Sequence, residues 1–249
     1  MARDRIYFVS DVHLGLDVKD PEERESRFVS WLDSIPRESA KALYLLGDIW
    51  DFWYEYRDVV PRTGARVVAR LTALVDSGVE VYFFEGNHDI WTFSFFEELG
   101  MKKRTQPYYM EEGGKIFCIG HGDGLGKVKR SYRLMLDVFR SKVAQTLFST
   151  LHPWLAYRFA MKWSGSNRRS HSPYTFKGPG EPLYEFVTAS EESRHADFYI
   201  FGHYHDRVDM TLPSGSRLLL LKDWMDGGCP CAVYDSSTCE LRFSDGPLK

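Results

Sequence analysis

Five short polar clusters combine aspartate, histidine and asparagine, which are residue types that bind metal ions. The candidate ligands in these clusters are Asp11, His13, Asp48, Asn87, His121, His203 and His205. Their carboxylate, imidazole and amide donors suit Mn²⁺, Fe or Zn²⁺ better than a thiophilic metal. Seven ligands are too many for one tetrahedral site, but they fit two neighbouring divalent ions with Asp48 as the bridge. Paired ions of this kind serve phosphoryl hydrolysis.

Each cluster follows a short apolar run that is typical of a buried strand. These runs are Ile6–Ser10, Ala42–Leu46, Val79–Phe84, Lys115–Ile119 and Asp197–Phe201. Helical patterns over Pro21–Ile35 and Thr63–Ser77 alternate with them, so the sequence predicts an α/β fold. Sites in such sheets gather at the carboxyl ends of the strands, where these clusters lie. After residue 206, four further runs predict an all-β tail that pairs with the main sheet or stacks on it.

A single cluster of this kind also arises by chance, because a lone histidine is often structural. Five clusters in this order are more specific, and the series DxH, GDxxD, GNHD, GHGD and GHxH resembles the calcineurin-like metallophosphoesterases. The resemblance covers nearly the whole chain and implies a four-layer αββα sandwich, with two β-sheets flanked by helices. It also implies the distribution of the ligands. One ion would be held by Asp11, His13, Asp48 and His205, and the other by Asp48, Asn87, His121 and His203.

The predicted reaction is attack on phosphorus by a hydroxide that bridges the two ions. His88 directly follows a predicted ligand, so we expect it to act in the same cleft, as a general acid or as a hydrogen-bond donor to phosphate. Asp51 or Asp89 would orient a histidine ligand. The alternative for these two carboxylates is an ordinary capping or turn role.

The formal net charge of -3 conceals an uneven distribution of charge. Residues 125–169 contain ten Lys or Arg residues and one acid, whereas the other residues carry 22 basic and 34 acidic groups. The gaps between successive ligands from Asp11 to His121 are 37, 39 and 34 residues, but the gap from His121 to His203 is 82. We therefore predict a body of residues 1–124 and 182–249, with an inserted segment of residues 125–181.

Apolar residues recur at helical spacing within this segment and predict a helical hairpin with a basic outer side. One interpretation is a cap that merely covers the core. Another is a lid that holds an anionic, apolar substrate at an acidic lipid surface. Single-stranded nucleic acid is a third interpretation. The predominance of Leu, Met, Phe and Val favours acyl chains or packing, so we predict no nucleic-acid partner.

The chain's size and the basic insert resemble the branch of this family that cleaves the pyrophosphate of UDP-2,3-diacylglucosamine in bacterial lipid A synthesis. This resemblance implies a lipid-linked nucleotide sugar as substrate, Mn²⁺ as metal, and a cytoplasmic enzyme attached peripherally to the inner membrane. The chain departs from the branch at His88, where an Arg is expected, and at Lys129, where an acid is expected. Candidate substrate contacts are Tyr132, Arg133, Ser164, Asn167, Arg168 and Arg169. The alternative for each is simple surface exposure.

Two other functions stay open at this point. One is a general phosphoesterase that acts on nucleotides, phosphodiesters or phosphoproteins. The other is a scaffold without catalysis, which would be expected to lose metal ligands, whereas all seven are present. The four cysteines are too few and too clustered for a disulfide framework. No signal peptide is recognisable, and the sequence leaves the oligomeric state undetermined.

Overall fold

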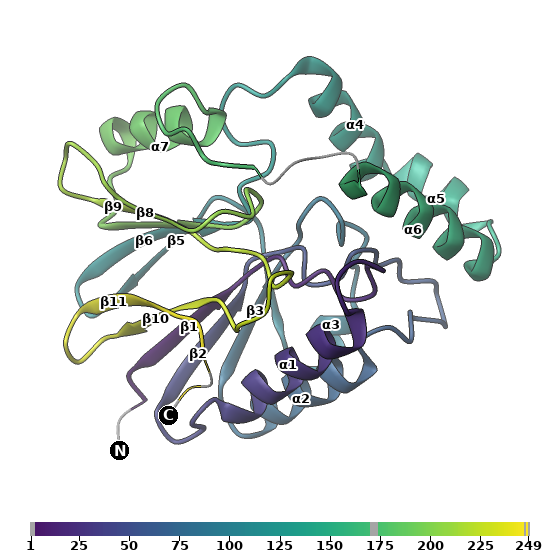
Figure 1. Cartoon of the computed structure of the whole chain (residues 1–249), viewed down its shortest axis with the longest axis horizontal. Coiled ribbons are helices and arrows are strands. Elements are labelled where there is room, and N and C mark those ends of the chain that lie inside the picture. Colours follow the sequence, from purple (N-terminus) through teal and green to yellow (C-terminus); the bar gives the residue numbers. More distant parts are fainter. Residues whose placement is uncertain (1–2, 170–173, 247, 249) are drawn as a thin grey trace.

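The protein is a four-layer sandwich of two β-sheets between helices, as the resemblance predicts (Figure 1). The computed structural model describes residues 3–169, 174–246 and 248. Within the helix that ends at Arg169, the side chains of residue 163 and residues 165–169 are not described.

The first sheet has the strand order β11-β10-β1-β2-β3-β4. Its strands are β1 (Arg5–Val9), β2 (Ala40–Leu45), β3 (Glu80–Phe84), β4 (Lys102–Arg104), β10 (Cys231–Asp235) and β11 (Glu240–Ser244). The strands β1 to β4 run parallel, so that the carboxyl ends of β1, β2 and β3 meet at one edge. The pair β10–β11 joins antiparallel beside β1 and makes the sheet mixed.

The second sheet has the strand order β5-β6-β7-β9-β8. Its strands are β5 (Tyr108–Glu112), β6 (Lys115–Gly120), β7 (Phe198–Phe201), β8 (Val208–Thr211) and β9 (Arg217–Leu220). Here β6, β7 and β9 are parallel, whereas β5 and β8 are antiparallel edge strands. The predicted β tail is therefore divided, because β8 and β9 join this sheet while β10 and β11 join the first.

Three apolar layers hold the sandwich together, since each sheet buries residues on both faces. Helices α1 (Pro21–Ser34) and α2 (Ala65–Asp76) cover the outer face of the first sheet, and the short α3 (Phe95–Glu98) lies on the same side (Figure 1). Helix α7 (Pro182–Ser193) covers the outer face of the second sheet. Between the sheets, rings such as Phe8 and Phe117 stack with their centroids 6.1 Å apart.

The remaining helices, α4 (Arg130–Arg140), α5 (Lys142–Ser149) and α6 (Pro153–Arg169), lie beside the sandwich at one end of the two sheets (Figure 1). They are three helices, where the sequence predicts a hairpin of two. Aromatic packing joins them to the body, with Trp91 and Phe148 4.5 Å apart between ring centroids. Trp91 also donates a hydrogen bond to the carbonyl of Phe139. None of the helices among the described residues is long and apolar enough to cross a bilayer.

The cation of Arg24 is fully buried in α1, where it holds the loop after β1 in place. Its guanidinium donates hydrogen bonds to the carbonyl oxygens of His13 (3.0 Å), Leu16 (2.6 Å) and Val18 (3.0 Å). Buried charge is tolerated when it is hydrogen-bonded in this way. The side chain therefore connects a helix of the outer layer to the first polar loop.

Replacing Arg24 with Met should lower the free energy of unfolding by about 3 kcal/mol, because several buried carbonyl groups lose their donors. Urea denaturation followed by circular dichroism measures the change. The matched control is Arg70→Met on α2, where the guanidinium is half-exposed and pairs with Asp33. Its effect should stay below about 1 kcal/mol. Equal losses in the two variants would contradict the role given to Arg24.

Candidate metal centre

All the predicted ligands lie in loops at the carboxyl ends of five parallel strands. Asp11 and His13 follow β1, and Asp48 follows β2. Asn87 follows β3, His121 follows β6, and the pair His203 and His205 follows β7. Because both sheets contribute, the site lies at the end of the seam between them. Two loops of this edge also contact each other directly, since the amide of His203 donates to Asp11 Oδ2 over 2.9 Å.

The backbone is left-handed at five of these residues. Asp11, His13, Asp48, His203 and His205 have φ angles of 54°, 50°, 52°, 69° and 55°. A side chain in this region costs free energy, and such strain concentrates where a site must be aimed. Helix and strand propensity cannot explain why so many left-handed residues lie at this one site. The loops are therefore shaped to turn the polar side chains toward one centre.

Two glycines allow the loops to approach the carboxylates closely. A Cβ atom on Gly86 would lie 2.1 Å from Asp48 Oδ1, and one on Gly202 would lie 2.3 Å from Asp11 Oδ2. Neither distance is possible for real atoms. These positions need glycine for space rather than for an unusual φ.

The side chains form a continuous group of oxygen and nitrogen donors. The Nε2 atoms of His13 and His205 lie 3.6 and 3.5 Å from Asp11 Oδ1. The Nε2 atoms of His13 and His121 lie 3.7 and 3.3 Å from Asp48 Oδ2. The amide oxygen of Asn87 is 3.4 Å from His121 Nε2. The ring of His203 packs on that of His121, with centroids 5.2 Å apart.

Three of the imidazoles are oriented by an acceptor at Nδ1. His13 Nδ1 lies 3.1 Å from Asp51 Oδ1, and His205 Nδ1 lies 2.8 Å from Asp223 Oδ2. His121 Nδ1 lies 2.9 Å from the carbonyl oxygen of Leu46. An Nδ1–H that donates outward leaves the lone pair on Nε2, which faces the carboxylates. This is the usual support of a histidine that binds a metal.

Asp223 is a supporting residue that the sequence reasoning missed. It follows one of the four strand-like runs after residue 206, which forms β9 (Arg217–Leu220), and β9 ends at the same edge as β7. The available signal was therefore a polar residue after a strand-like run. Asp223 belongs to none of the five motifs, so a motif does not predict its role.

Asp51 and Asp89 play different parts. The first lies within hydrogen-bond distance of His13, with Oδ1 3.1 Å from Nδ1. The carboxylate of Asp89 instead accepts hydrogen bonds from the backbone N–H groups of Gly86, Asp48, Ile49 and Trp50. Asp89 therefore fixes the loop that carries Asp48, rather than orienting a ligand. Burial, followed by the neighbouring charge of Asp48, raises the pKa of Asp89 to about 7.

The electrostatics of the cluster favour bound cations. Asp11 and Asp48 are almost fully buried, which by itself would raise the pKa of each carboxyl. Neighbouring histidines reverse this effect and hold both pKa values well below the usual range. Burial would lower the pKa of His121, but Asp48 holds it well above its ordinary value. Burial and the nearby His121 lower the pKa of His203 to about 4, so that ring is neutral near pH 7.

An unpaired buried oxygen indicates what the cluster accommodates. Asp11 Oδ1 accepts no hydrogen bond from the described residues, although it is buried. Such atoms are rare unless an ion or water satisfies them. The group Asp11–His13–His205 and the group Asp11–Asp48–His121 each bring three donor atoms within 4.8 Å of one another. The donor set and the unpaired oxygen therefore both fit divalent cations.

His88 lies at the border of this cluster. Its amide donates to Asp48 Oδ1 over 2.8 Å, and its ring meets that of His13 edge-on at 4.9 Å. The Nδ1 atom lies 3.1 Å from the carbonyl oxygen of Asp51. The side chain is 24% exposed, whereas His13 is fully buried. His88 is thus a histidine of this group that a substrate can reach, as is His205, which is 25% exposed.

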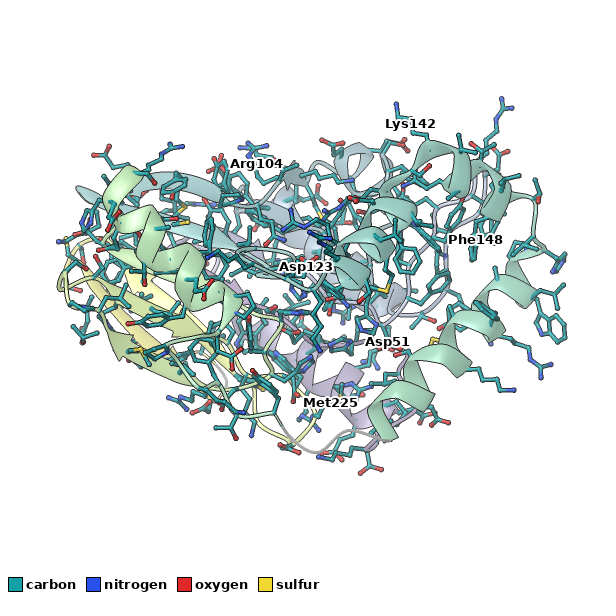
Figure 2. All side chains as sticks on the ribbon, turned by 90° about the horizontal axis from the view of Figure 1, so that it is seen from above. Asp51, Arg104, Asp123, Lys142, Phe148 and Met225 are labelled. Atoms are coloured by element: carbon teal, nitrogen blue, oxygen red, sulfur yellow. The ribbon has the colours of Figure 1, made fainter. Side chains whose placement is uncertain are left out.

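An apolar cavity of about 260 Å³ adjoins His88 and lies between the body and the insert. Most of its lining is apolar, and includes Phe52, Trp91, Met135, Phe139, Phe148 and Phe159. In Figure 2, Asp51 and Asp123 lie in the middle of the molecule, while Phe148 lies on the side of the insert helices. An apolar ligand in the cavity would reach the Asp and His cluster at Asn87 and His88.

The predicted substrate contacts fall in different places. Ser164 is buried and lines the apolar cavity. Tyr132 packs beside His203, with ring centroids 6.4 Å apart. Arg133 is exposed and donates to the carbonyl of Gly126, within the insert. The side chains of Asn167, Arg168 and Arg169 lie outside those that the structure describes.

The chain is similar to several known proteins. The family model of the calcineurin-like phosphoesterases matches residues 4–207. A protein named UDP-2,3-diacylglucosamine hydrolase from Porphyromonas gingivalis is 41% identical, covering 96% of this chain and 97% of its own. A protein of the same name from Neisseria meningitidis is 29% identical, covering 88% and 89%. A dimetal phosphatase structure from Danio rerio is 15% identical, with a TM-score of 0.48, covering 94% of this chain and 92% of its own.

Replacing Gly86 with Ala should weaken Mn²⁺ binding at least about tenfold, because the new methyl group must displace Asp48. Metal retained after equilibrium dialysis, measured by mass spectrometry, reports the change. Gly246→Ala is the control, since a Cβ atom there meets no neighbour within 4 Å. The interpretation is wrong if both variants retain as much Mn²⁺ as the unchanged protein.

Proposed function

The chain belongs to the calcineurin-like phosphoesterases, and on that premise we propose that it hydrolyses UDP-2,3-diacylglucosamine to UMP and 2,3-diacylglucosamine 1-phosphate. The observation that carries this proposal is the apolar cavity beside the metal centre, which a general phosphatase does not need. The relatives that bear the name of this activity match the chain over nearly their whole length, and one is 41% identical.

We assign two divalent ions to the cluster described above. Asp11, His13, Asp48 and His205 would hold one of them, and Asp48, Asn87, His121 and His203 the other. When bound, such ions make a water acidic enough to supply a nucleophile near neutral pH and neutralise charge on the phosphoryl oxygens. Mn²⁺ is the first candidate, while Fe and Zn²⁺ suit the same donors. Asp51 and Asp223 fix the tautomers of His13 and His205.

His88 would hold the phosphate group that is attacked. The carbonyl of Asp51 fixes its Nδ1 side, and its exposed part borders the apolar cavity. Its Nε2 is then the nitrogen available to the substrate. A charged imidazole there donates a hydrogen bond to a phosphoryl oxygen, or a proton to a departing oxygen.

The insert of residues 125–181 would bind the acyl chains and bring the enzyme to the membrane. Rings from α4 to α6 line the cavity next to His88 and give it an apolar wall that suits hydrocarbon. Other apolar side chains of the same helices are exposed, among them Leu134 (64%), Val143 (70%) and Leu147 (66%). The sequence of residues 125–169 also contains ten Lys and Arg residues, and such a combination of apolar and basic groups would suit the anionic inner leaflet.

The purified protein should release UMP from UDP-2,3-diacylglucosamine when Mn²⁺ is added, and chelation should abolish the reaction. Asp48→Asn, which removes the proposed bridging charge, should lower kcat by at least about 100-fold. Product analysis by liquid chromatography and mass spectrometry measures the rate. Failure to form UMP at saturating Mn²⁺, with bis(p-nitrophenyl) phosphate turned over as well as any UDP-sugar, would favour the general phosphoesterase instead.

Substitutions of His88 separate its two possible tasks. His88→Ala should lower kcat on the UDP-sugar by about 100-fold. His88→Arg should retain most of that rate, because a phosphate monoester with a second pKa of ~6 departs without a proton. On 2′,3′-cyclic UMP, whose leaving group is an alkoxide, both variants should be equally impaired. Equal rates of the Ala and Arg variants on the UDP-sugar would contradict a hydrogen-bonding role for His88.

A further inference from the structure

A second cavity, of about 380 Å³, opens next to the metal centre. It is lined by the loop after β6, the start of α4, the segment from Tyr174 to Pro182, and the residues 203–205. Its volume is in the range of small-molecule sites. The function proposed so far makes no use of this space.

Helix α4 separates the two cavities. Its later residues Met135 and Phe139 line the apolar cavity, whereas Lys129 at its start and Tyr132 in its first turn line the second one. The apolar cavity meets the metal centre at Asn87, on the side of the first sheet. The second cavity meets it at residues 203 and 205, on the side of the second sheet. The metal centre therefore has one cavity on each side.

The two cavities differ in chemistry. The second is lined by hydroxyl-bearing rings and by groups of both charges, notably Tyr132, Tyr174, Tyr204, Lys129 and Glu181. The hydroxyl of Tyr132 is buried and has no hydrogen-bond partner among the described residues. A buried unpaired hydroxyl is costly, and a polar ligand would remove that cost.

An aromatic ring at the wall of this cavity remains accessible. Tyr174 is 45% exposed, and its hydroxyl is held by Glu181. Its ring lies against that of Tyr204, with centroids 5.7 Å apart. A ring supported on one side and open on the other can stack on a nucleobase. Lys129 is exposed at the same cavity and adds positive charge where a phosphate would lie.

We propose that this second cavity binds the nucleoside monophosphate half of the substrate, with Tyr174 stacking on the base. The inference rests on the proposed function, in which the bond that is cut joins an acylated sugar phosphate to a nucleotide. That bond must lie at the metal centre, so the two halves extend to opposite sides of it. The apolar cavity suits the acyl half, and the polar, aromatic cavity suits the nucleotide.

Isothermal titration calorimetry on the Mn²⁺-loaded full chain tests the proposal. The ligands are UMP and ribose 5-phosphate, which share a sugar and a phosphate but differ in the base. The unchanged protein should bind UMP about tenfold more tightly. Tyr174→Ala should abolish this preference, whereas Tyr174→Phe, which keeps the ring, should retain it. The matched control is Phe93→Ala, a ring of similar exposure (40%) that packs on Tyr54 and should leave UMP affinity unchanged.

The result that overturns the inference is an equal affinity of the unchanged protein for UMP and ribose 5-phosphate. Unaltered UMP preference in Tyr174→Ala, with circular dichroism showing a native fold, would overturn it as well. In steady-state assays, the same variant should raise KM for the UDP-sugar while kcat changes little. The binding experiment does not require turnover, so an enzyme that binds UMP at Tyr174 but leaves the lipid substrate intact would refute the proposed function alone.

Discussion

The rest of the structure depends on two almost fully buried carboxylates, Asp11 and Asp48. A buried negative charge is tolerated only beside positive charge or hydrogen-bond donors. Here the available donors are few, and one oxygen of Asp11 has none among the described residues. Without bound ions, protonated histidines around the pair offset the negative charge. When ions bind, the same histidines offer them lone pairs. Most other features of the loops at the carboxyl ends of the strands prevent the two carboxylates from moving apart or turning toward water.

The restraint comes from several layers of the fold at once. Left-handed backbone turns aim the side chains, and Gly86 and Gly202 leave no room for them to retreat. Asp89 gathers four N–H groups and thereby fixes the Asp48 loop, while buried Arg24 fixes the loop of His13. These supports lie in the body, and the insert contributes none of the proposed metal ligands. The proposed metal ligands thus belong to the body, whereas the body and the insert together line the apolar cavity.

The sequence was informative where chemistry is local. Polar clusters after strand-like runs can be recognised because residue type and periodicity act over a few positions. The strands β1, β2, β3, β6 and β7 lie where those runs predict them. Contacts made through tertiary packing could not be predicted from the sequence. Nothing local distinguishes Asp51, which reaches His13, from Asp89, which holds backbone amides. Asp223 depends on β9 ending beside β7. Helix α7 and the strands β4 and β5 also went unpredicted, although Pro182 marks the start of α7.

The position of β1 has a consequence for how the protein is made. This strand lies in the interior of its sheet, between β2 and β10, and β10 comes from a segment much later in the sequence. The amide of His203 also reaches back 192 positions to the carboxylate of Asp11. During synthesis, the first donors leave the ribosome long before their partners exist. The nascent polypeptide therefore carries an incomplete metal-binding set until residues 203–205 have also been made, so the centre can be completed only once these distant segments of the chain have come together.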